Sequence, residues 1–169
     1  MKYKKIALIG MMGSGKTTIS KLLAKKTGWE LFDTDKIFEQ ENNITISDFF
    51  KNYSQEEFRK KENELLKTIS KNENIVISTG GGIILNQENR EILFNRDIFS
   101  IYLKTSPNVI FERIKNDKSR PLLQVENPKA EIEKIISSRE KYYNLAKLTV
   151  ITNNKNTEEI TEEIWKKLI

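Results

Sequence analysis

Gly10-Met11-Met12-Gly13-Ser14-Gly15-Lys16-Thr17 fits, without a mismatch, the pattern of glycine, any four residues, glycine, lysine and serine or threonine. An apolar run at 6–9 precedes it, as expected of a buried strand, and a segment with apolar residues on one helical face follows it to about Gly28. In this pattern the glycines let several backbone N–H groups turn inward, and the positive end of the helix dipole lies beside them. The stretch therefore predicts a site for the phosphates of a nucleotide, a P-loop.

Lys16 and Thr17 have the most specific predicted roles in this loop. We expect the Lys16 ammonium to reach the β- and γ-phosphates of ATP, and the Thr17 hydroxyl to bind Mg²⁺. A chance match in a glycine-rich turn is the alternative, but it does not explain the strand before the loop and the helix after it. The expected ATP contacts in the loop are Gly13, Ser14, Gly15, Lys16, Thr17 and Thr18.

The rest of the chain alternates between short apolar runs and helical patterns. Further strands are expected at 30–33, 75–78, 98–103 and 148–152. Helix starts are indicated by the capping box that begins at Ser54 and by the Ser106-Pro107 and Asn127-Pro128 pairs. This alternation predicts an α/β fold with a parallel sheet covered on both faces. We expect one domain, 1–169, with two inserted segments that lack strands, at about 34–60 and about 117–128.

The composition restricts the chemistry. The 169 residues contain no cysteine and no histidine, so an acid–base step falls to a carboxylate, a lysine or a tyrosine. No apolar run approaches the ~18 residues that span a bilayer, so we expect a cytoplasmic protein with no membrane partner. The net charge of +5 comes from lysines interleaved with glutamates, which favours a solvated surface over a nucleic-acid-binding one.

Two motifs at strand ends are candidates for the phosphoryl acceptor site. Asp33 and Asp35 follow the second strand, and in an extended segment residues two apart point the same way, so both carboxylates can face one cleft. Helix capping is the alternative role for this pair. Thr79-Gly80-Gly81-Gly82 ends the third strand and places bare backbone where a ligand can approach, although a flexible turn would use the same residues.

Three arginines complete the candidate set. Arg59 follows Phe58 in a charged helical stretch, Arg120 opens Arg120-Pro121-Leu122-Leu123 in a polar loop, and Arg139 lies in the next helix. The loop could close over the nucleotide and bring Arg120 to the transferring phosphate. Taken singly, each arginine is compatible with an ordinary surface position.

Together these motifs resemble those of the shikimate kinase family. The resemblance runs from Gly10 to about Ala146 and includes the P-loop, Asp33-Thr34-Asp35, Phe58-Arg59 with Glu62, the triple glycine, the Arg120 motif, and Arg139 with Tyr143. It implies a fold of the nucleoside-monophosphate-kinase type, with five parallel strands in the order 2-3-1-4-5. It also implies transfer of the ATP γ-phosphoryl group to the 3-hydroxyl of shikimate, on the route to chorismate and the aromatic amino acids.

The resemblance also implies a role for each site residue. Asp35, Lys16 and Arg120 are the implied catalytic residues: Asp35 would hold the acceptor hydroxyl, and Arg120 would close on the phosphates. Asp33 would act on Mg²⁺ through water. Shikimate would contact Asp35, Arg59, Gly80, Gly81, Gly82 and Arg139, and Arg113 would lie near the adenine. The implied partners are ATP and shikimate, and the implied state is a monomer.

Some positions depart from the family pattern. Ser20 and Ser54-Gln55 stand where glycine and glycine-glutamate are common, and Lys141 stands where proline is common. The Lys141 change could alter how Arg139 is presented. The alternatives are a kinase for a sugar acid such as gluconate or for a nucleoside monophosphate, and a regulatory nucleotide-binding module without catalysis.

Overall fold

The computed structural model describes residues 2–117 and 124–169 and contains a five-stranded parallel sheet. Its order is β2-β3-β1-β4-β5, which confirms the predicted fold. The strands are β1 (Lys5–Ile9), β2 (Glu30–Asp33), β3 (Ile75–Ser78), β4 (Ile98–Lys104) and β5 (Leu148–Ile151). The register places Asp33 and Leu8 on either side of Ser78, so the carboxyl ends of the first three strands meet at one edge.

Helices connect the strands, as the alternating pattern predicts. They are α1 (Lys16–Thr27), α2 (Thr34–Asn42), α3 (Ile46–Asn52), α4 (Gln55–Ile69), α5 (Gln87–Leu93), α6 (Pro107–Ile114), α7 (Pro128–Tyr143) and α8 (Thr157–Leu168), with a 3₁₀ turn η1 (Ile83–Leu85). No element was predicted in 83–97, where η1 and α5 lie. The segment 34–60 contains α2, α3 and the first part of α4 and, as predicted, no strand.

The predicted helix starts have the expected local chemistry. The Ser54 hydroxyl accepts a hydrogen bond from the Glu57 N–H, and the Glu57 carboxylate accepts one from the Ser54 N–H, so the capping box at α4 is confirmed. Ser106 and Asn127 cap α6 and α7, each followed by proline at the first helical position. These caps satisfy N–H groups that have no partner inside the helix.

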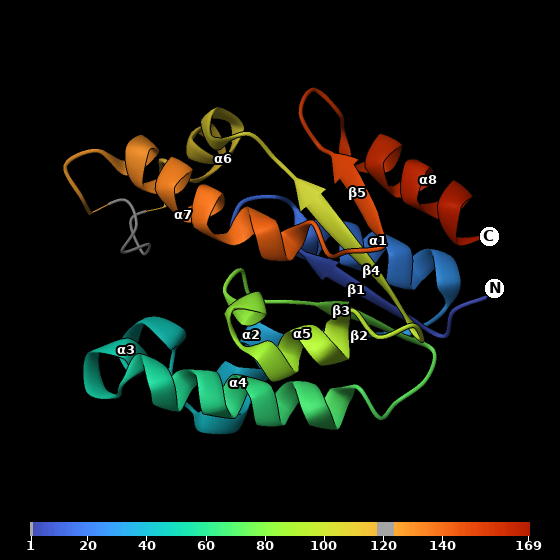
Figure 1. Cartoon of the computed structure of the whole chain (residues 1–169), viewed down its shortest axis with the longest axis horizontal. Coiled ribbons are helices and arrows are strands. Elements are labelled where there is room, and N and C mark those ends of the chain that lie inside the picture. Colours follow the sequence, from blue (N-terminus) through green and yellow to red (C-terminus); the bar gives the residue numbers. More distant parts are fainter. Residues whose placement is uncertain (1, 118–123) are drawn as a thin grey trace.

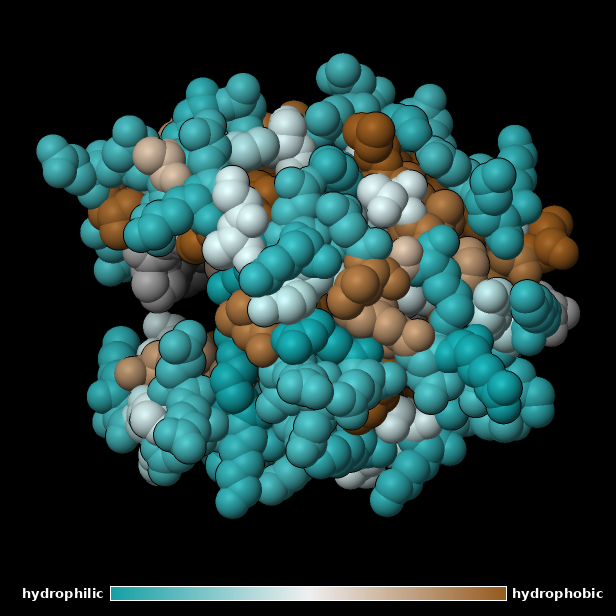
Figure 2. All heavy atoms as spheres, in the orientation of Figure 1, coloured by the Kyte–Doolittle hydropathy of each residue, from teal (hydrophilic) through white to brown (hydrophobic). Residues whose placement is uncertain are grey.

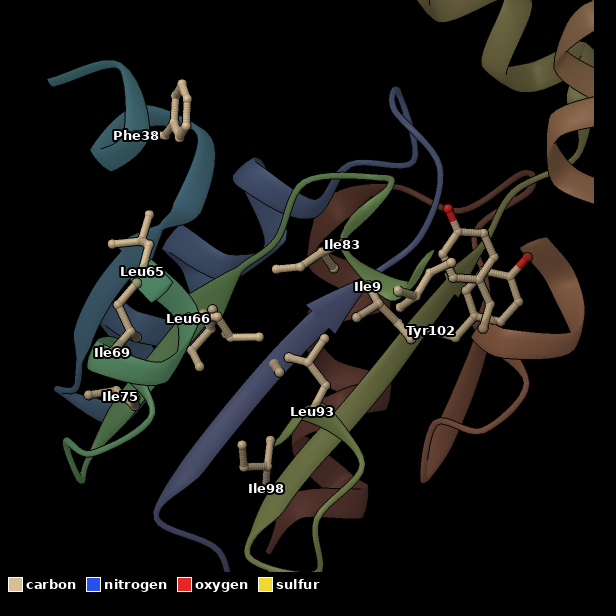
Figure 3. Close-up of a cluster of buried hydrophobic side chains, with 14 of the residues drawn as sticks. Ile9, Phe38, Leu65, Leu66, Ile69, Ile75, Ile83, Leu93, Ile98 and Tyr102 are labelled. Atoms are coloured by element: carbon tan, nitrogen blue, oxygen red, sulfur yellow. The ribbon is translucent and has the colours of Figure 1, made fainter. Parts of the chain in front are cut away.

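Apolar side chains cover both faces of the sheet. On one face, α1 and α8 pack over residues such as Leu8, Ile101 and Val150. On the other, a larger cluster joins α2, α4 and η1 to the sheet, and Figure 3 shows Leu66, Ile83 and Ile9 within it. Full burial of one such side chain is worth roughly 1.5–3 kcal/mol, so these two clusters supply much of the drive for folding.

The helices at the carboxyl edge of the sheet form the surroundings of the candidate site. In Figure 1 the arrowheads of β1 and β4 point toward the end where α6 and α7 lie, and the labelled N and C ends lie at the other end. A third apolar cluster fastens the P-loop to these helices, with Met11 packed near Ile110 and Ile132. In the part of the chain that the structure describes, no helix is long and apolar enough to cross a membrane.

Candidate active site

The P-loop joins β1 to α1 with its lysine folded across the loop. Lys16, the first residue of α1, is only 8% exposed, and its Nζ donates to the carbonyl oxygens of Gly10 (2.8 Å) and Met11 (2.9 Å). Arg113, on α6, donates from Nη1 to the Gly13 carbonyl at 3.1 Å. Two cations therefore lie against the backbone of this loop.

Asp33 connects the P-loop to the second strand. Its Oδ2 accepts a hydrogen bond from the Thr17 hydroxyl at 3.2 Å, and its Oδ1 accepts one from the Lys36 N–H at 3.3 Å. The aspartate therefore caps α2 and also faces the P-loop, so the two roles that the sequence left open are compatible.

The Thr17–Asp33 pair could hold a magnesium ion whose remaining ligands are waters and substrate phosphates. Among residues 2–117 and 124–169, no three or more acidic side chains form a cluster that could hold a metal by themselves. Mg²⁺ keeps several waters and binds one or two protein oxygens together with substrate phosphates. A hydroxyl and a carboxylate side by side at the P-loop are suitable donors for such an ion.

Asp35 reaches the site from a helix and not from a strand. It lies in the first turn of α2, so the argument from extended-chain geometry was wrong for this residue. Burial raises its pKa above the ordinary value, and so does the nearby Asp33 carboxylate, while the Lys16 ammonium opposes the shift. The result is a carboxylate whose proton affinity is raised beside the P-loop.

The glycines after β3 let Asp35 approach the backbone closely. A Cβ on Gly80 would lie 2.6 Å from Asp35 Oδ1, closer than atoms can pack. The Gly80 N–H donates to the Thr34 hydroxyl oxygen at 3.1 Å, which ties this turn to the start of α2. Thr34 was not predicted as a site residue, and its place between Asp33 and Asp35 is the one sequence feature that points to it.

Arg59 lies over the last of these glycines. A Cβ on Gly82 would lie 2.2 Å from Arg59 Nη2, so the guanidinium occupies the space of the missing side chain. Arg59 Nη1 also donates to Glu62 Oε2 at 2.6 Å. Burial raises the pKa of Glu62 to about 7 despite the opposing charge of Arg59. Glu62 belongs to the family resemblance but had no predicted function.

Arg139 and Tyr143 contact the middle glycine from α7. Arg139 Nη1 donates to the Gly81 carbonyl at 3.3 Å, and Tyr143 Oη donates to the same oxygen at 2.6 Å. Both predicted carboxylate-binding arginines, Arg59 and Arg139, therefore lie next to the triple glycine. Arg120 lies outside the described residues, as does most of the first half of the segment 117–128.

A cavity of about 260 Å³ joins the donor and acceptor sides. Its lining includes Lys16, Thr17, Asp33, Asp35 and Gly81. A larger hollow of about 840 Å³ lies between α4 and α5, but it is lined mainly by exposed polar side chains, and Arg59 is the one residue of the candidate site in its lining. Figure 2 shows a mostly hydrophilic surface that is hollowed between the region of α3 and that of α7.

A P-loop facing a partly buried carboxylate and two arginines, at the carboxyl edge of a parallel sheet with this strand order, defines a P-loop kinase for a small molecule. The sequence model described as shikimate kinase matches residues 12–169. The chain belongs to the shikimate kinase family. It is accordingly an ATP-dependent kinase.

Relatives and solved structures agree with this family. The chain is 41% identical to a shikimate kinase of Thermodesulfovibrio yellowstonii over 96% of its own length and 94% of the relative's. It is 37% identical to one of Caldanaerobacter subterraneus over 98% and 96%. A structure of shikimate kinase from Acinetobacter baumannii in complex with shikimate superposes with a TM-score of 0.93 at 33% identity, covering 98% of this chain and 93% of that one.

More distant structures share the fold alone. A deoxyadenosine kinase from M. mycoides has a TM-score of 0.62 at 21% identity, and a gluconokinase from Sinorhizobium meliloti has 0.56 at 15%. The gluconokinase is of the sugar-acid kind that the sequence left open, whereas the deoxyadenosine kinase is a nucleoside kinase and not a kinase for a nucleoside monophosphate. At such identities the likeness carries no statement about the acceptor.

Proposed function

We propose that this chain transfers the γ-phosphoryl group of ATP to the 3-hydroxyl of shikimate, with Asp35 holding the hydroxyl that attacks. The observation that carries the assignment is the position of Asp35, packed closely against Gly80 and lining one cavity with Lys16 and Thr17. In the reaction the bond from the γ-phosphorus to the β,γ-bridging oxygen breaks, and a bond to the shikimate oxygen forms. The hydroxyl proton passes to Asp35.

The donor side positions and neutralises the phosphates. Backbone N–H groups of residues 13–18 bind the phosphate oxygens, and the Lys16 ammonium turns from the loop carbonyls to the β- and γ-phosphates. Mg²⁺, when bound by Thr17 and, through water, by Asp33, supplies further positive charge. Phosphoryl transfer needs this positioning more than covalent help, so a chain without histidine or cysteine can perform it.

The acceptor side recognises a carboxylated polyol. The Arg59 and Arg139 guanidinium groups are planar forks that suit the shikimate carboxylate, and the backbone of residues 80–82 lies close to the ring. The raised pKa of Asp35 makes its carboxylate a better proton acceptor than an exposed aspartate. The two arginines thus hold the carboxylate of shikimate, and Asp35 holds its reacting hydroxyl.

The remaining assignments complete the proposal. Arg113 lies near the adenine, Arg120 closes on the phosphates, and the segments 34–60 and 117–128 serve as substrate-binding segment and lid within one domain. The protein acts in the cytoplasm as a monomer and has no nucleic-acid or membrane partner.

A coupled assay of ADP release tests the acceptor. Purified protein is given ATP, Mg²⁺ and either shikimate, gluconate or AMP, and we expect turnover with shikimate alone. Turnover with gluconate or AMP but not with shikimate would overturn the proposal. Binding of ATP and shikimate without ADP release would instead favour a regulatory module that has lost catalysis.

A further inference from the structure

Tyr143 is a buried phenol whose hydroxyl is directed at the candidate substrate site. It is the last residue of α7, and only 1% of it is exposed. Its Oη donates to the carbonyl oxygen of Gly81 at 2.6 Å, across 62 positions of sequence. A buried tyrosine hydroxyl needs a partner, and here the partner is the backbone of the triple glycine.

The ring of Tyr143 is fixed from the opposite side by the core. It stacks on Tyr102 of β4, with centroids 4.9 Å apart and an interplanar angle of 19°. Figure 3 shows Tyr102 at the β4 side of the buried cluster. Because burial also raises the pKa of Tyr143, the phenol stays protonated and remains a hydrogen-bond donor.

The orientation of the Gly81 peptide depends on contacts of this kind. No Cβ restricts the backbone at residues 80–82, so the local chain has more conformations open to it than any other sequence would. The C=O of Gly81 and the N–H of Gly82 belong to one planar trans peptide and point in opposite directions. A donor that holds the carbonyl toward α7 therefore also sets the direction of the Gly82 N–H.

Gly81 is confined on its other side by the P-loop. A Cβ built on it would lie 3.3 Å from Met12 N and 3.4 Å from the Gly10 carbonyl oxygen. The hydroxyl of Tyr143 thus holds Gly81 between α7 and the phosphate-binding loop. Loss of the hydrogen bond from Tyr143 to Gly81 would let residues 80–82 move, while the stacked rings of Tyr143 and Tyr102 kept their packing in the core.

Tyr143 also acts on Arg139. The two residues are four apart on α7, so they lie on one face of the helix, and both donate to the Gly81 oxygen. The shared acceptor therefore fixes the guanidinium and the phenol at one point of the glycine turn.

We propose that Tyr143 is a positioning residue for the acceptor substrate: its hydroxyl holds the Gly81 carbonyl and thereby orients the 80–82 backbone and Arg139 toward the shikimate carboxylate. This inference rests on the proposed function. It assigns Tyr143 no contact with substrate and no part in proton transfer.

The test compares Tyr143→Phe with Tyr102→Phe. Each variant removes one hydroxyl from the same stacked pair, but only Tyr143 donates to Gly81. We expect Tyr143→Phe to raise the KM for shikimate about tenfold, the size of one lost hydrogen bond, and to change the KM for ATP less than about twofold. Tyr102→Phe should leave both constants within about twofold of the wild type.

Thermal unfolding of both variants separates positioning from folding, and Tyr143→Phe should unfold within a few degrees of Tyr102→Phe. An unchanged KM for shikimate in Tyr143→Phe, or an equal rise for shikimate and ATP, would overturn the inference. If Tyr143→Phe is too unstable to assay at the usual temperature, the same comparison at a lower temperature must show the selective rise for shikimate, and failure to show it also overturns the inference. If the wild-type protein released no ADP in response to shikimate, the proposed function itself would be wrong. That outcome is distinct from an unchanged KM in Tyr143→Phe, which would contradict only the role of Tyr143.

Discussion

Arg59 Nη1 and Glu62 Oε2 lie 2.6 Å apart on one face of α4, with only 3% of the Glu62 side chain exposed. The second carboxylate oxygen of Glu62 is buried and has no hydrogen-bond partner among the described residues. A buried carboxylate that is only half satisfied is costly in its charged form. The pair holds Arg59 in place at an electrostatic cost that depends on pH.

We predict that Glu62 makes the protein less stable as pH rises from about 4.5 to about 7. Its pKa is about 7 in the folded chain against 4.5 for the unfolded group, so the folded state binds more protons in this window. The free energy of unfolding therefore falls with rising pH, by roughly 3 kcal/mol from this one group. Glu62→Gln should remove that part of the dependence, measured by urea unfolding at several pH values.

Glu64→Gln is the matched control for this measurement. Glu64 lies on the same helix but is exposed, so its replacement should leave the pH dependence of the wild type in place. Identical pH profiles for the wild type and Glu62→Gln would show that Glu62 has the same pKa in the folded and the unfolded protein, and would contradict the prediction.

Replacing Asp35 should remove catalysis but keep nucleotide binding. Asp35→Asn retains the shape of the side chain and loses the proton acceptor, so we expect kcat to fall about 100- to 10,000-fold. ATP affinity, measured by calorimetry, should change little because the P-loop is untouched. Asp48→Asn, at a partly exposed position on α3, is the control and should keep wild-type kcat. A near-normal kcat in Asp35→Asn would exclude Asp35 as the base.

Replacing Arg59 should act on the acceptor and not on the nucleotide. Arg59→Ala removes a fork donor and a charge, so we expect the KM for shikimate to rise about 10- to 100-fold while the KM for ATP stays near the wild-type value. Lys60→Ala removes a charge from the adjacent exposed position and should leave both constants near normal. An unchanged affinity for shikimate would remove Arg59 from the site.

Much of the fold could be predicted because its determinants are local. The P-loop, the apolar strands and the caps at Ser54, Ser106 and Asn127 each depend on residues within a few positions of one another. The sheet order followed from the family resemblance. The stretch 83–97 was missed because η1 and α5 are short, three and seven residues, and give no sustained helical period.

The acceptor side was harder to predict because its contacts are long-range. The bond from Tyr143 to Gly81 joins residues 62 apart, and the bond from Gly80 to Thr34 joins residues 46 apart. No local pattern encodes such pairs. The helical position of Asp35 was also missed, because the strand ends one residue before α2 begins.

At Gly80 and Gly82 an added Cβ would collide with two different side chains, so we predict different effects for the two alanine variants. On Gly82 the added atom would meet the end of the flexible Arg59 side chain, at 2.2 Å from Nη2. Arg59 can move away, so Gly82→Ala should fold normally and raise the KM for shikimate, as Arg59→Ala does. On Gly80 the added atom would meet Asp35 Oδ1 at 2.6 Å, so Gly80→Ala should mainly lower kcat.

Steady-state kinetics on both alanine variants distinguish these outcomes, and Gly28→Ala is the control. Gly28 ends α1 with φ of 72° and has nothing within 4 Å of an added Cβ, so alanine there strains the backbone without touching the site. We expect it to cost about 1 kcal/mol of stability and to leave kcat and both KM values unchanged. If Gly80→Ala and Gly82→Ala changed kcat and the KM for shikimate in the same way, a general disturbance of the turn would explain both variants. That result would contradict separate roles for the Asp35 contact in catalysis and the Arg59 contact in shikimate binding.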